Sequence, residues 1–531
     1  MEIRTDEAEL TYLQARVASI SGDHARSAAL LATLADAQPD QVDLARRAIG
    51  EAISAGQMEL AVRLAREIPP AKLTSDARLL LAAEELRRNR PERALHWLSV
   101  NADNGALDFL TPLVNAWTAA SRGDLKRALE TVDQVPAGSL LGPLRAEQRA
   151  FILLKFRKPA EAEPFAQRAI AAAGGRESRL RLALADGFVA AGDQARALAL
   201  LEPTGSDGAA ARQRVLSRKS LGQVIDTPAK AFSEVLAAFA ADVARLDRVA
   251  APVGLVQVAR YANPQNSSAA VLLALLLDDQ GRSDEALAVL RSVPEGDALE
   301  DHVRDIQVRI LSDKKRFGEA YAIAQAGVSS AGASAGDYSR LGDLYQAMKR
   351  PAEAADAYWR AISLSGRNAP PRELWPLYLL RANALEEANR WPEAKQSLEQ
   401  GLAIAPDQPL LLNFLGYAKL ERGEDMDNAE KLIRKASELA PDDASITDSL
   451  GWAQFKRGKV AEAIETLQRA AEKDPDQAEI QEHLGDALYK SGQRFQARFA
   501  WNAALLNADD EIAARIRAKL ATGLTPANAA P

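Results

Sequence analysis

Small residues recur among apolar ones at a nearly constant spacing along the chain. The clearest segments are Leu415-Gly416-Tyr417, Leu450-Gly451-Trp452 and Leu484-Gly485-Asp486, whose glycines are 35 and 34 residues apart. An alanine follows each glycine after 12 or 13 residues, and these alanines are Ala429, Ala463 and Ala497. A small residue on each of two helices lets them approach closely, and an intervening glycine supplies the turn. The pattern therefore predicts a series of helical hairpins.

The same phase continues toward the N-terminus and gives 14 candidate hairpins. The residues at the close-approach position of the first helix are Ala15, Ile49, Ala82, Ala116, Ala150, Ala185, Ala240, Ala274, Val308, Gly342, Ala382, Gly416, Gly451 and Gly485. Their partners on the second helix are Ser27, Ala61, Ala94, Ala128, Ala162, Ala197, Pro252, Ala286, Ala320, Ala354, Ala394, Ala429, Ala463 and Ala497. Alanine occupies 12 of these 14 partner positions, so chance does not explain the series. The early units lack the glycine and the aromatic anchors, which indicates degenerate repeats.

A hairpin of this length resembles the tetratricopeptide repeat, whose signature is W-x2-L-G-x2-Y, then A-x3-F, then P. Tyr338-x2-Leu341-Gly342-x2-Tyr345, followed by Ala354-x3-Tyr358, is the best match in the chain. The resemblance implies an all-α fold, an α-solenoid superhelix of about 14 tandem tetratricopeptide-repeat hairpins whose N-terminal members are degenerate. Neighbouring hairpins in such an array share one continuous core.

The phase of the repeat breaks once. The step from Ala185 to Ala240 is 55 residues, and the interval contains the turn-rich segment Pro203-Thr204-Gly205-Ser206-Asp207-Gly208. We therefore expect an N-terminal array over residues 1–202, a linker or hinge over 203–230 and a C-terminal array over 231–520. Residues 521–531 are rich in turn-forming residues and are expected to form a disordered tail.

The stretch from about residue 227 to residue 507 carries a more specific series of motifs. Asn413-Phe414-Leu415-Gly416-Tyr417 is followed by Asp448-Ser449-Leu450-Gly451-Trp452, His483-Leu484-Gly485-Asp486 and Ala497-x3-Trp501. This series is similar to the tetratricopeptide lipoproteins of the proteobacterial cell envelope, one of which presents substrates to a periplasmic carboxy-terminal processing protease. The resemblance implies a periplasmic or outer-membrane-associated adaptor. The sequence lacks a signal segment, and a cytoplasmic location is the alternative.

Composition excludes several classes of chemistry. The chain has no cysteine and four histidines among 531 residues, which rules out disulfides, thiolate metal sites and a cysteine nucleophile. The net charge of −7 argues against a nucleic-acid-binding protein. The longest apolar run, Ala269 to Leu277, has nine residues, and a membrane span needs about 18. We expect no cofactor and no metal, since none of the phosphate-binding, nucleophile-elbow or zinc motifs is present.

The pitch of a helix predicts which residues of the first helices face the concave groove. These residues stand three before, one after and four after the close-approach position. In the last four hairpins they are Asn383, Asn413, Tyr417, Leu420, Asp448, Trp452, Phe455, Glu482, Asp486 and Tyr489. The rings would supply contact area for a peptide, and the polar groups would bond its backbone or attract its basic residues. The alternative for Trp452 and Phe455 is packing between hairpins.

The sequence therefore predicts a non-enzymatic scaffold that binds a protein or peptide partner in its groove. By resemblance, the partners would be a carboxy-terminal processing protease and its substrates. The alternative is an assembly scaffold for cell-envelope polysaccharide export or outer-membrane biogenesis. An enzyme is disfavoured because repeats occupy nearly the whole chain. The identity of the partner and the oligomeric state stay open.

Overall fold

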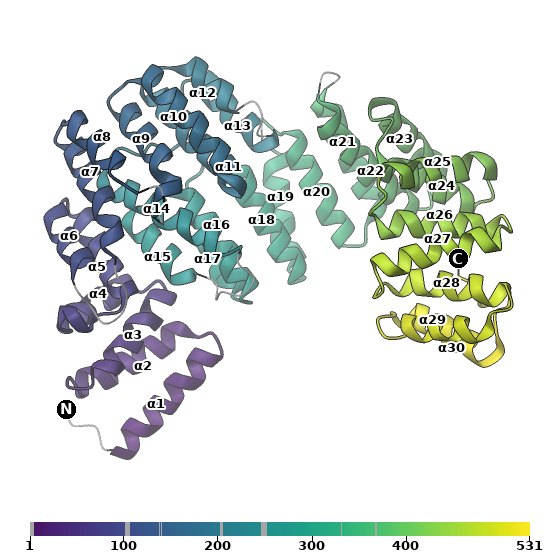
Figure 1. The fold of residues 1–531 in the computed structure, drawn as a ribbon, viewed down its shortest axis with the longest axis horizontal. Coiled ribbons are helices and arrows are strands. Elements are labelled where there is room, and N and C mark those ends of the chain that lie inside the picture. Colours follow the sequence, from purple (N-terminus) through teal and green to yellow (C-terminus); the bar gives the residue numbers. More distant parts are fainter. Residues whose placement is uncertain are drawn as a thin grey trace. The chain divides into compact units, whose positions relative to one another are not determined.

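The computed structural model describes residues 5–100, 107–136, 138–139, 141–201, 205–245, 252–330, 332–366 and 369–530. Within these ranges the chain forms 30 α-helices, four short 3-10 helices and no strand, which confirms the predicted all-α class (Figure 1). The chain divides into two compact units, unit 1 (Met1–Arg316) and unit 2 (Phe317–Pro531).

Unit 1 contains the first 18 α-helices in chain order. They are α1 (Thr5–Ile20), α2 (His24–Ala37), α3 (Val42–Ser54), α4 (Met58–Glu67), α5 (Ser75–Arg87), α6 (Pro91–Ser99), α7 (Thr111–Ser121), α8 (Leu125–Asp133), α9 (Arg145–Lys155), α10 (Pro159–Ala172), α11 (Glu177–Ala190), α12 (Gln194–Leu201), α13 (Gly205–Leu216), α14 (Pro228–Val243), α15 (Val253–Ala262), α16 (Ser267–Asp279), α17 (Ser283–Arg291) and α18 (Glu300–Asp313). Its 3-10 helices are η1 (Pro70–Lys72), η2 (Asp108–Leu110), η3 (Gly142–Leu144) and η4 (Gly174–Arg176).

Unit 2 contains the other 12 α-helices. They are α19 (Phe317–Val328), α20 (Ala335–Ala347), α21 (Pro351–Ser365), α22 (Pro371–Glu387), α23 (Trp391–Ile404), α24 (Pro409–Glu421), α25 (Met426–Leu439), α26 (Ala444–Lys456), α27 (Val460–Lys473), α28 (Ala478–Lys490), α29 (Arg494–Ala504) and α30 (Asp510–Thr522). The helices α20 to α29 form five consecutive hairpins, each with close contact between its two members.

The predicted close-approach residues lie at the centres of the hairpins. Every predicted second-helix alanine is fully buried, and Pro252 is half-buried at the start of α15. Gly451 shows why a small residue is needed, since a Cβ atom added there would lie 2.6 Å from Cγ of Leu467 on the opposite helix. The ninth predicted hairpin is divided, because α18 belongs to unit 1 and α19 to unit 2.

The segment expected to be a linker is largely structured. Residues 203 and 204 lie outside the described residues, but residues 205–216 form α13 and the following loop is bound to α11. The buried carboxylate of Asp186 accepts hydrogen bonds from the backbone N–H groups of Leu221 at 2.9 Å and Gln223 at 2.6 Å. These bonds hold the loop against the preceding array, so residues 203–230 are not a boundary between the two units.

After this loop the chain of unit 1 folds back on itself. Helices α14 and α15 pack against α3, α5 and α7, which are first helices of earlier hairpins (Figure 1). Tyr261 on α15 donates a hydrogen bond to Glu84 at 2.7 Å, and Arg282 donates one to the carbonyl oxygen of Ser54 at 3.0 Å. The first-helix face of the early hairpins is therefore covered by the chain's own helices.

The expected disordered tail also differs from the structure. Helix α30 extends to Thr522, and residues 523–530 return over α28. The backbone N–H of Ala530 donates a hydrogen bond to Asp486 at 3.1 Å, and Ala530 belongs to a buried apolar cluster with Leu420 and Trp452. A hydrogen bond and apolar contacts thus order a segment whose composition alone indicates disorder.

Candidate functional site

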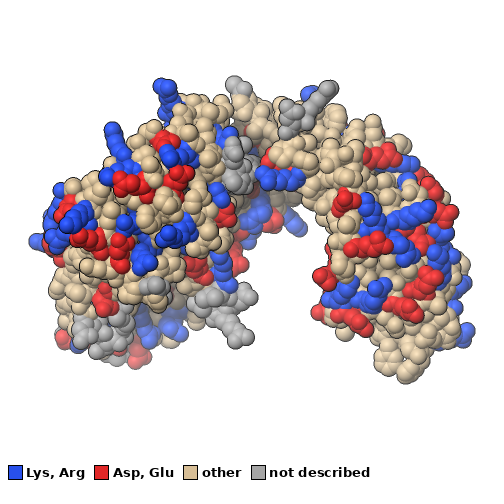
Figure 2. Space-filling view, turned by 45° about the horizontal axis from the view of Figure 1, so that its top comes forward, with Lys and Arg blue, Asp and Glu red and all other residues tan. Residues whose placement is uncertain are grey.

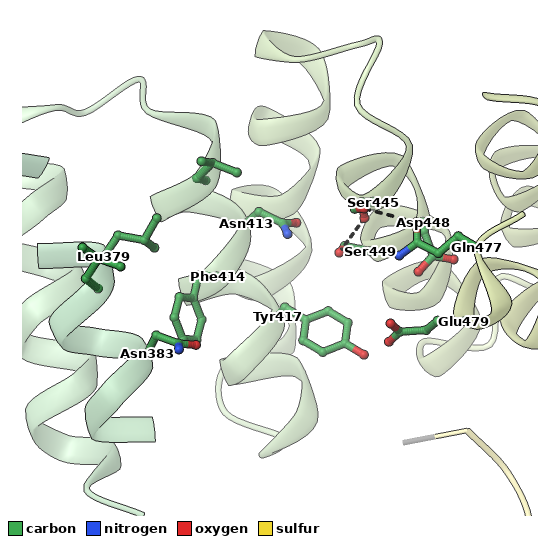
Figure 3. Close-up of a pocket in the computed structure, with 12 residues that line it drawn as sticks. Leu379, Asn383, Asn413, Phe414, Tyr417, Ser445, Asp448, Ser449, Gln477 and Glu479 are labelled. Carbon is green, nitrogen blue, oxygen red and sulfur yellow. Dashed lines mark hydrogen bonds between the residues drawn. The ribbon is translucent and has the colours of Figure 1, made fainter. Parts of the chain in front are cut away.

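The first helices of unit 2 line an open cavity of about 490 Å³. Its walls come from α22, α24 and α26 and from the residues at the start of α28 (Figure 3). The lining residues are Leu379, Leu380, Asn383, Leu410, Asn413, Phe414, Tyr417, Ser445, Asp448, Ser449, Gln477 and Glu479. The cavity therefore crosses three successive hairpins and reaches the fourth.

Four of the ten predicted groove residues line this cavity, namely Asn383, Asn413, Tyr417 and Asp448. The prediction missed the residues six and two positions before the close-approach residue, which are Leu410, Ser445 and Glu479 in one row and Leu380, Phe414 and Ser449 in the other. The first row lies one turn N-terminal to the predicted position three before the close-approach residue, and the second row lies beside that position and widens the same face. Continuing the i, i+3, i+4 pattern by one turn would have found them.

The two ends of the cavity differ in chemistry. At the α22 end, the side chains of Leu379, Leu380 and Phe414 make an apolar wall. At the α26–α28 end the lining is polar and acidic, with Asp448 and Glu479 as the charged groups. The cavity can therefore hold an apolar side chain at one end and a cationic one at the other.

Two oxygen atoms of the cavity residues have unused hydrogen-bonding capacity. Among the residues that the structure describes, neither Oδ1 of Asn413 nor Oδ1 of Asp448 has a hydrogen-bond partner, although both atoms are buried. Leaving a buried acceptor unpaired costs about 1 to 3 kcal/mol. A ligand donor that reaches these two atoms would recover this cost, which makes them candidate contacts; unpaired buried side-chain atoms also occur outside the cavity, for example on Ser27 and Gln454.

Tyr417 lies at the centre of the cavity. Figure 3 shows its hydroxyl group pointing toward the carboxylate of Glu479. Burial raises the pKa of Tyr417 far above its ordinary value, and the negative charges of Glu421, Glu479 and Asp448 raise it further. The ring therefore stays neutral at physiological pH and offers a flat contact surface with one polar end.

Asp448 connects the cavity to a buried aromatic stack. Its Oδ2 atom lies 2.8 Å from Nδ1 of His483, which is inaccessible to solvent. The rings of Trp452 and His483 stack at 4.1 Å, and Phe455 stacks on Trp452 at 4.8 Å. Burial lowers the pKa of His483, but the charge and hydrogen bond of Asp448 outweigh it, and the net pKa is raised.

Trp452 is thus a packing residue and is not available to a partner in this structure. It is 1% exposed, and its two stacking neighbours hold it between α26 and α28. Trp452 and Phe455 therefore pack between hairpins, which is the alternative interpretation of these two residues.

Glu482 and Asp486 also lie outside the open cavity, contrary to the prediction. Both side chains are fully buried beneath α30, where Nζ of Lys519 lies 2.6 Å from Glu482 and 2.8 Å from Asp486. Burial raises the pKa of Glu482, but hydrogen bonds from Arg515 and Lys519 outweigh it and lower the net pKa. Burial raises the pKa of Asp486, and Lys519 offsets only part of that rise. These acids anchor the last helix, because α30 supplies their counter-ions.

Leu420, Phe455 and Tyr489, four positions after the close-approach residues, do not line the cavity either. Leu420 is buried in the cluster that includes Ala530, and Phe455 packs against the same cluster. Tyr489 packs on Trp501, with ring centroids 5.4 Å apart, and lies against Gly523. The helical pitch places all three on the predicted face, but residues 523–530 cover this part of it.

No group of three or more potential metal ligands occurs among the described residues. None of the described helices is long and apolar enough to cross a membrane. On the face shown in Figure 2, acidic and basic side chains are intermixed over both units, without a continuous basic area.

Comparisons with known proteins agree on the repeat type. Residues 379–444 match the family model described as tetratricopeptide repeat, and residues 451–492 match a second model described as TPR repeat. These matches cover α23, α24, α25, α27 and α28 in full and about half of α22 and of α26, so the helices that line the cavity are matched as tetratricopeptide repeats over most of their length. No curated protein matches the chain.

Several solved structures are similar over long stretches. The APC/C hetero-tetramer Cut9–Hcn1 is 15% identical with a TM-score of 0.36, over 98% of this chain and 92% of that chain. The human IFIT1 dimer with PPP-AAAA is 15% identical with a TM-score of 0.32, over 82% and 95%. The thermophilic TPR protein TTC0263 of Thermus thermophilus is 19% identical with a TM-score of 0.31, over 35% and 100%.

Proposed function

We propose that the chain is a non-enzymatic interaction scaffold whose unit 2 binds an extended segment of a partner protein across the first helices α22, α24 and α26. The observation that carries the proposal is the pair of buried, unpaired acceptors on Asn413 and Asp448. Both residues line the cavity, so backbone N–H groups or a cationic side chain of the partner would complete their hydrogen bonding.

The cavity also indicates the sequence that a partner segment would carry. An aliphatic or aromatic side chain fits against Leu379, Leu380 and Phe414, and a lysine or arginine fits beside Asp448 and Glu479. A segment with one apolar and one basic residue, a few positions apart, satisfies both ends. The charge of the basic residue determines the direction in which the partner segment lies in the groove.

Selection from a phage-displayed library of random peptides against the whole chain tests this proposal. We expect the enriched peptides to combine a basic residue with an apolar residue at a fixed spacing. Peptides enriched without a basic residue, or no enrichment above the uncoated support, would contradict the proposal.

The narrower role, as an adaptor that delivers substrates to a periplasmic carboxy-terminal processing protease, remains a proposal that rests on the motif series from Asn413 to Trp501. The same series supports a periplasmic or outer-membrane-associated location. Co-purification from the native envelope, followed by mass spectrometry, tests both statements. Recovery of the protease supports the adaptor role, whereas recovery of polysaccharide-export or outer-membrane assembly components would favour the alternative.

A further inference from the structure

Residues 524–530 cover part of the groove that the sequence assigns to a partner. We call residues 524–530 the C-terminal strap. Its Leu524 packs on the apolar cluster formed by α27, α28, α29 and α30, and its Ala530 lies in the cluster formed by α24, α25 and α26. The strap thus contacts the first-helix face beside the open cavity, where Tyr417 takes part in both regions.

The strap makes fewer polar contacts with the rest of unit 2 than the helix that precedes it. Helix α30 is fixed by the buried ion pairs of Lys519 with Glu482 and Asp486. The strap contains no charged residue, and among the described residues it makes one hydrogen bond to the groove, from the N–H of Ala530 to Asp486. Its other hydrogen bonds are internal, between Thr525, Asn528 and Gly523.

The junction between the fixed helix and the strap is Gly523. Its φ of 81° lies in the left-handed region that favours glycine, and a Cβ atom there would clash with the hydroxyl oxygen of Tyr489. The chain can therefore turn back over α28 only because this residue has no side chain. Gly523 thus lies between helix α30, which buried ion pairs hold in place, and the C-terminal strap, which makes few polar contacts.

We propose that the C-terminal strap is an intramolecular ligand of the groove, and that an extended partner segment of small, uncharged residues displaces it. This inference rests on the proposed function, because it treats the strap as occupying one part of the same peptide-binding face. The chemistry of the strap defines the partner class. Small side chains such as alanine fit over Leu420 and Phe455, and a backbone N–H reaches the carboxylate of Asp486.

Binding of the strap sequence in trans tests the proposal. The probe is a fluorescein-labelled synthetic peptide of residues 523–531, titrated by anisotropy with the full chain and with a chain that ends at Gly523. Because a bound strap occupies the surface that the peptide needs, we expect the truncated chain to bind at least about tenfold more tightly. A scrambled peptide of the same composition is the control. Equal affinity for both chains, or no binding to a folded truncated chain, would overturn the proposal.

A variant of full length provides a second test if truncation lowers the helical content. Ala530→Pro removes the N–H donor without shortening the chain, and Ala529→Pro is the matched control, because no hydrogen bond from Ala529 to the groove occurs among the described residues. We expect tighter peptide binding by Ala530→Pro than by Ala529→Pro. Equal binding would overturn the proposal that a partner segment displaces the strap. The library selection tests the proposed function independently of the strap. It predicts that peptides with a basic residue bind at the open cavity, whether or not the strap is displaced.

Discussion

Lys519 and Glu482 form an ion pair with a distance of 2.6 Å between Nζ and Oε1, and neither side chain is accessible to solvent. Lys519 also lies 2.8 Å from Asp486, and Arg515 lies 3.0 Å from Glu482, so two cations from α30 face two acids of α28. The pairs explain why two predicted groove acids are not part of the open cavity. They also make α30 an essential closing element of unit 2.

Replacing Lys519 by methionine should destabilise unit 2 strongly. The substitution removes a buried cation and leaves two carboxylates without it, which costs about 3 to 5 kcal/mol in comparable pairs. Denaturant unfolding followed by circular dichroism measures the loss. The control is Arg517→Met on the exposed face of the same helix, which should change the unfolding free energy by less than about 0.5 kcal/mol. Equal effects of the two substitutions would show that the ion pairs do not anchor α30.

The glycine at the close-approach position gives a second prediction. A Cβ atom at Gly451 would lie 2.6 Å from Cγ and 3.2 Å from the backbone nitrogen of Leu467. Overpacking of this kind costs about 1 to 3 kcal/mol, so Gly451→Ala should lower the stability of unit 2. Denaturant unfolding of the variant measures this loss.

Gly318 on α19 provides a matched control for this substitution, because no atom lies within 4 Å of a Cβ added there. Gly318 lies in the first turn of α19, so Gly318→Ala should be neutral or stabilising by less than about 1 kcal/mol. A stabilising effect at Gly451 would mean that the two helices of this hairpin are not in close contact.

The pair of His483 and Asp448 predicts a pH dependence. The pKa of His483 is raised in the folded state above its unfolded value of about 6.5, so the pair contributes its full stability below that pH. The contribution decreases as the pH rises through the folded-state pKa. His483→Gln should therefore lower the unfolding free energy more at about pH 5.5 than at about pH 8.5. A larger effect at the higher pH would contradict the assigned ion pair with Asp448.

The repeat could be predicted from sequence because it depends on local spacing. A small residue is required wherever two helices come close together. Ala463 and Ala497, one repeat apart, are both fully buried at such positions. The folding back of α14 and α15 could not be predicted in this way. It depends on pairs such as Tyr261 with Glu84, 177 residues apart, for which helical periodicity carries no signal.

Part of the candidate site could also be predicted from sequence, because helical pitch is a local property. Helical pitch places Asn413 and Asp448 on the correct face, since their orientation is a property of one helix. It does not reveal what covers that face. Lys519 buries Asp486 from another helix, and Ala530 covers Leu420 from a segment whose composition resembles a disordered tail.

The acidic end of the cavity offers the most direct test of partner binding. Glu479 is exposed, lines the cavity and forms no hydrogen bond or ion pair through its side chain among the described residues, so Glu479→Lys should leave the fold intact. Glu472, exposed on the neighbouring helix α27 and outside the cavity lining, provides a control of identical charge change. The measurement is the Kd of a selected basic and apolar peptide for the wild-type chain and both variants. We predict a loss of about tenfold or more for Glu479→Lys and little change for Glu472→Lys. Equal affinities for the two variants would contradict binding of the partner in this cavity.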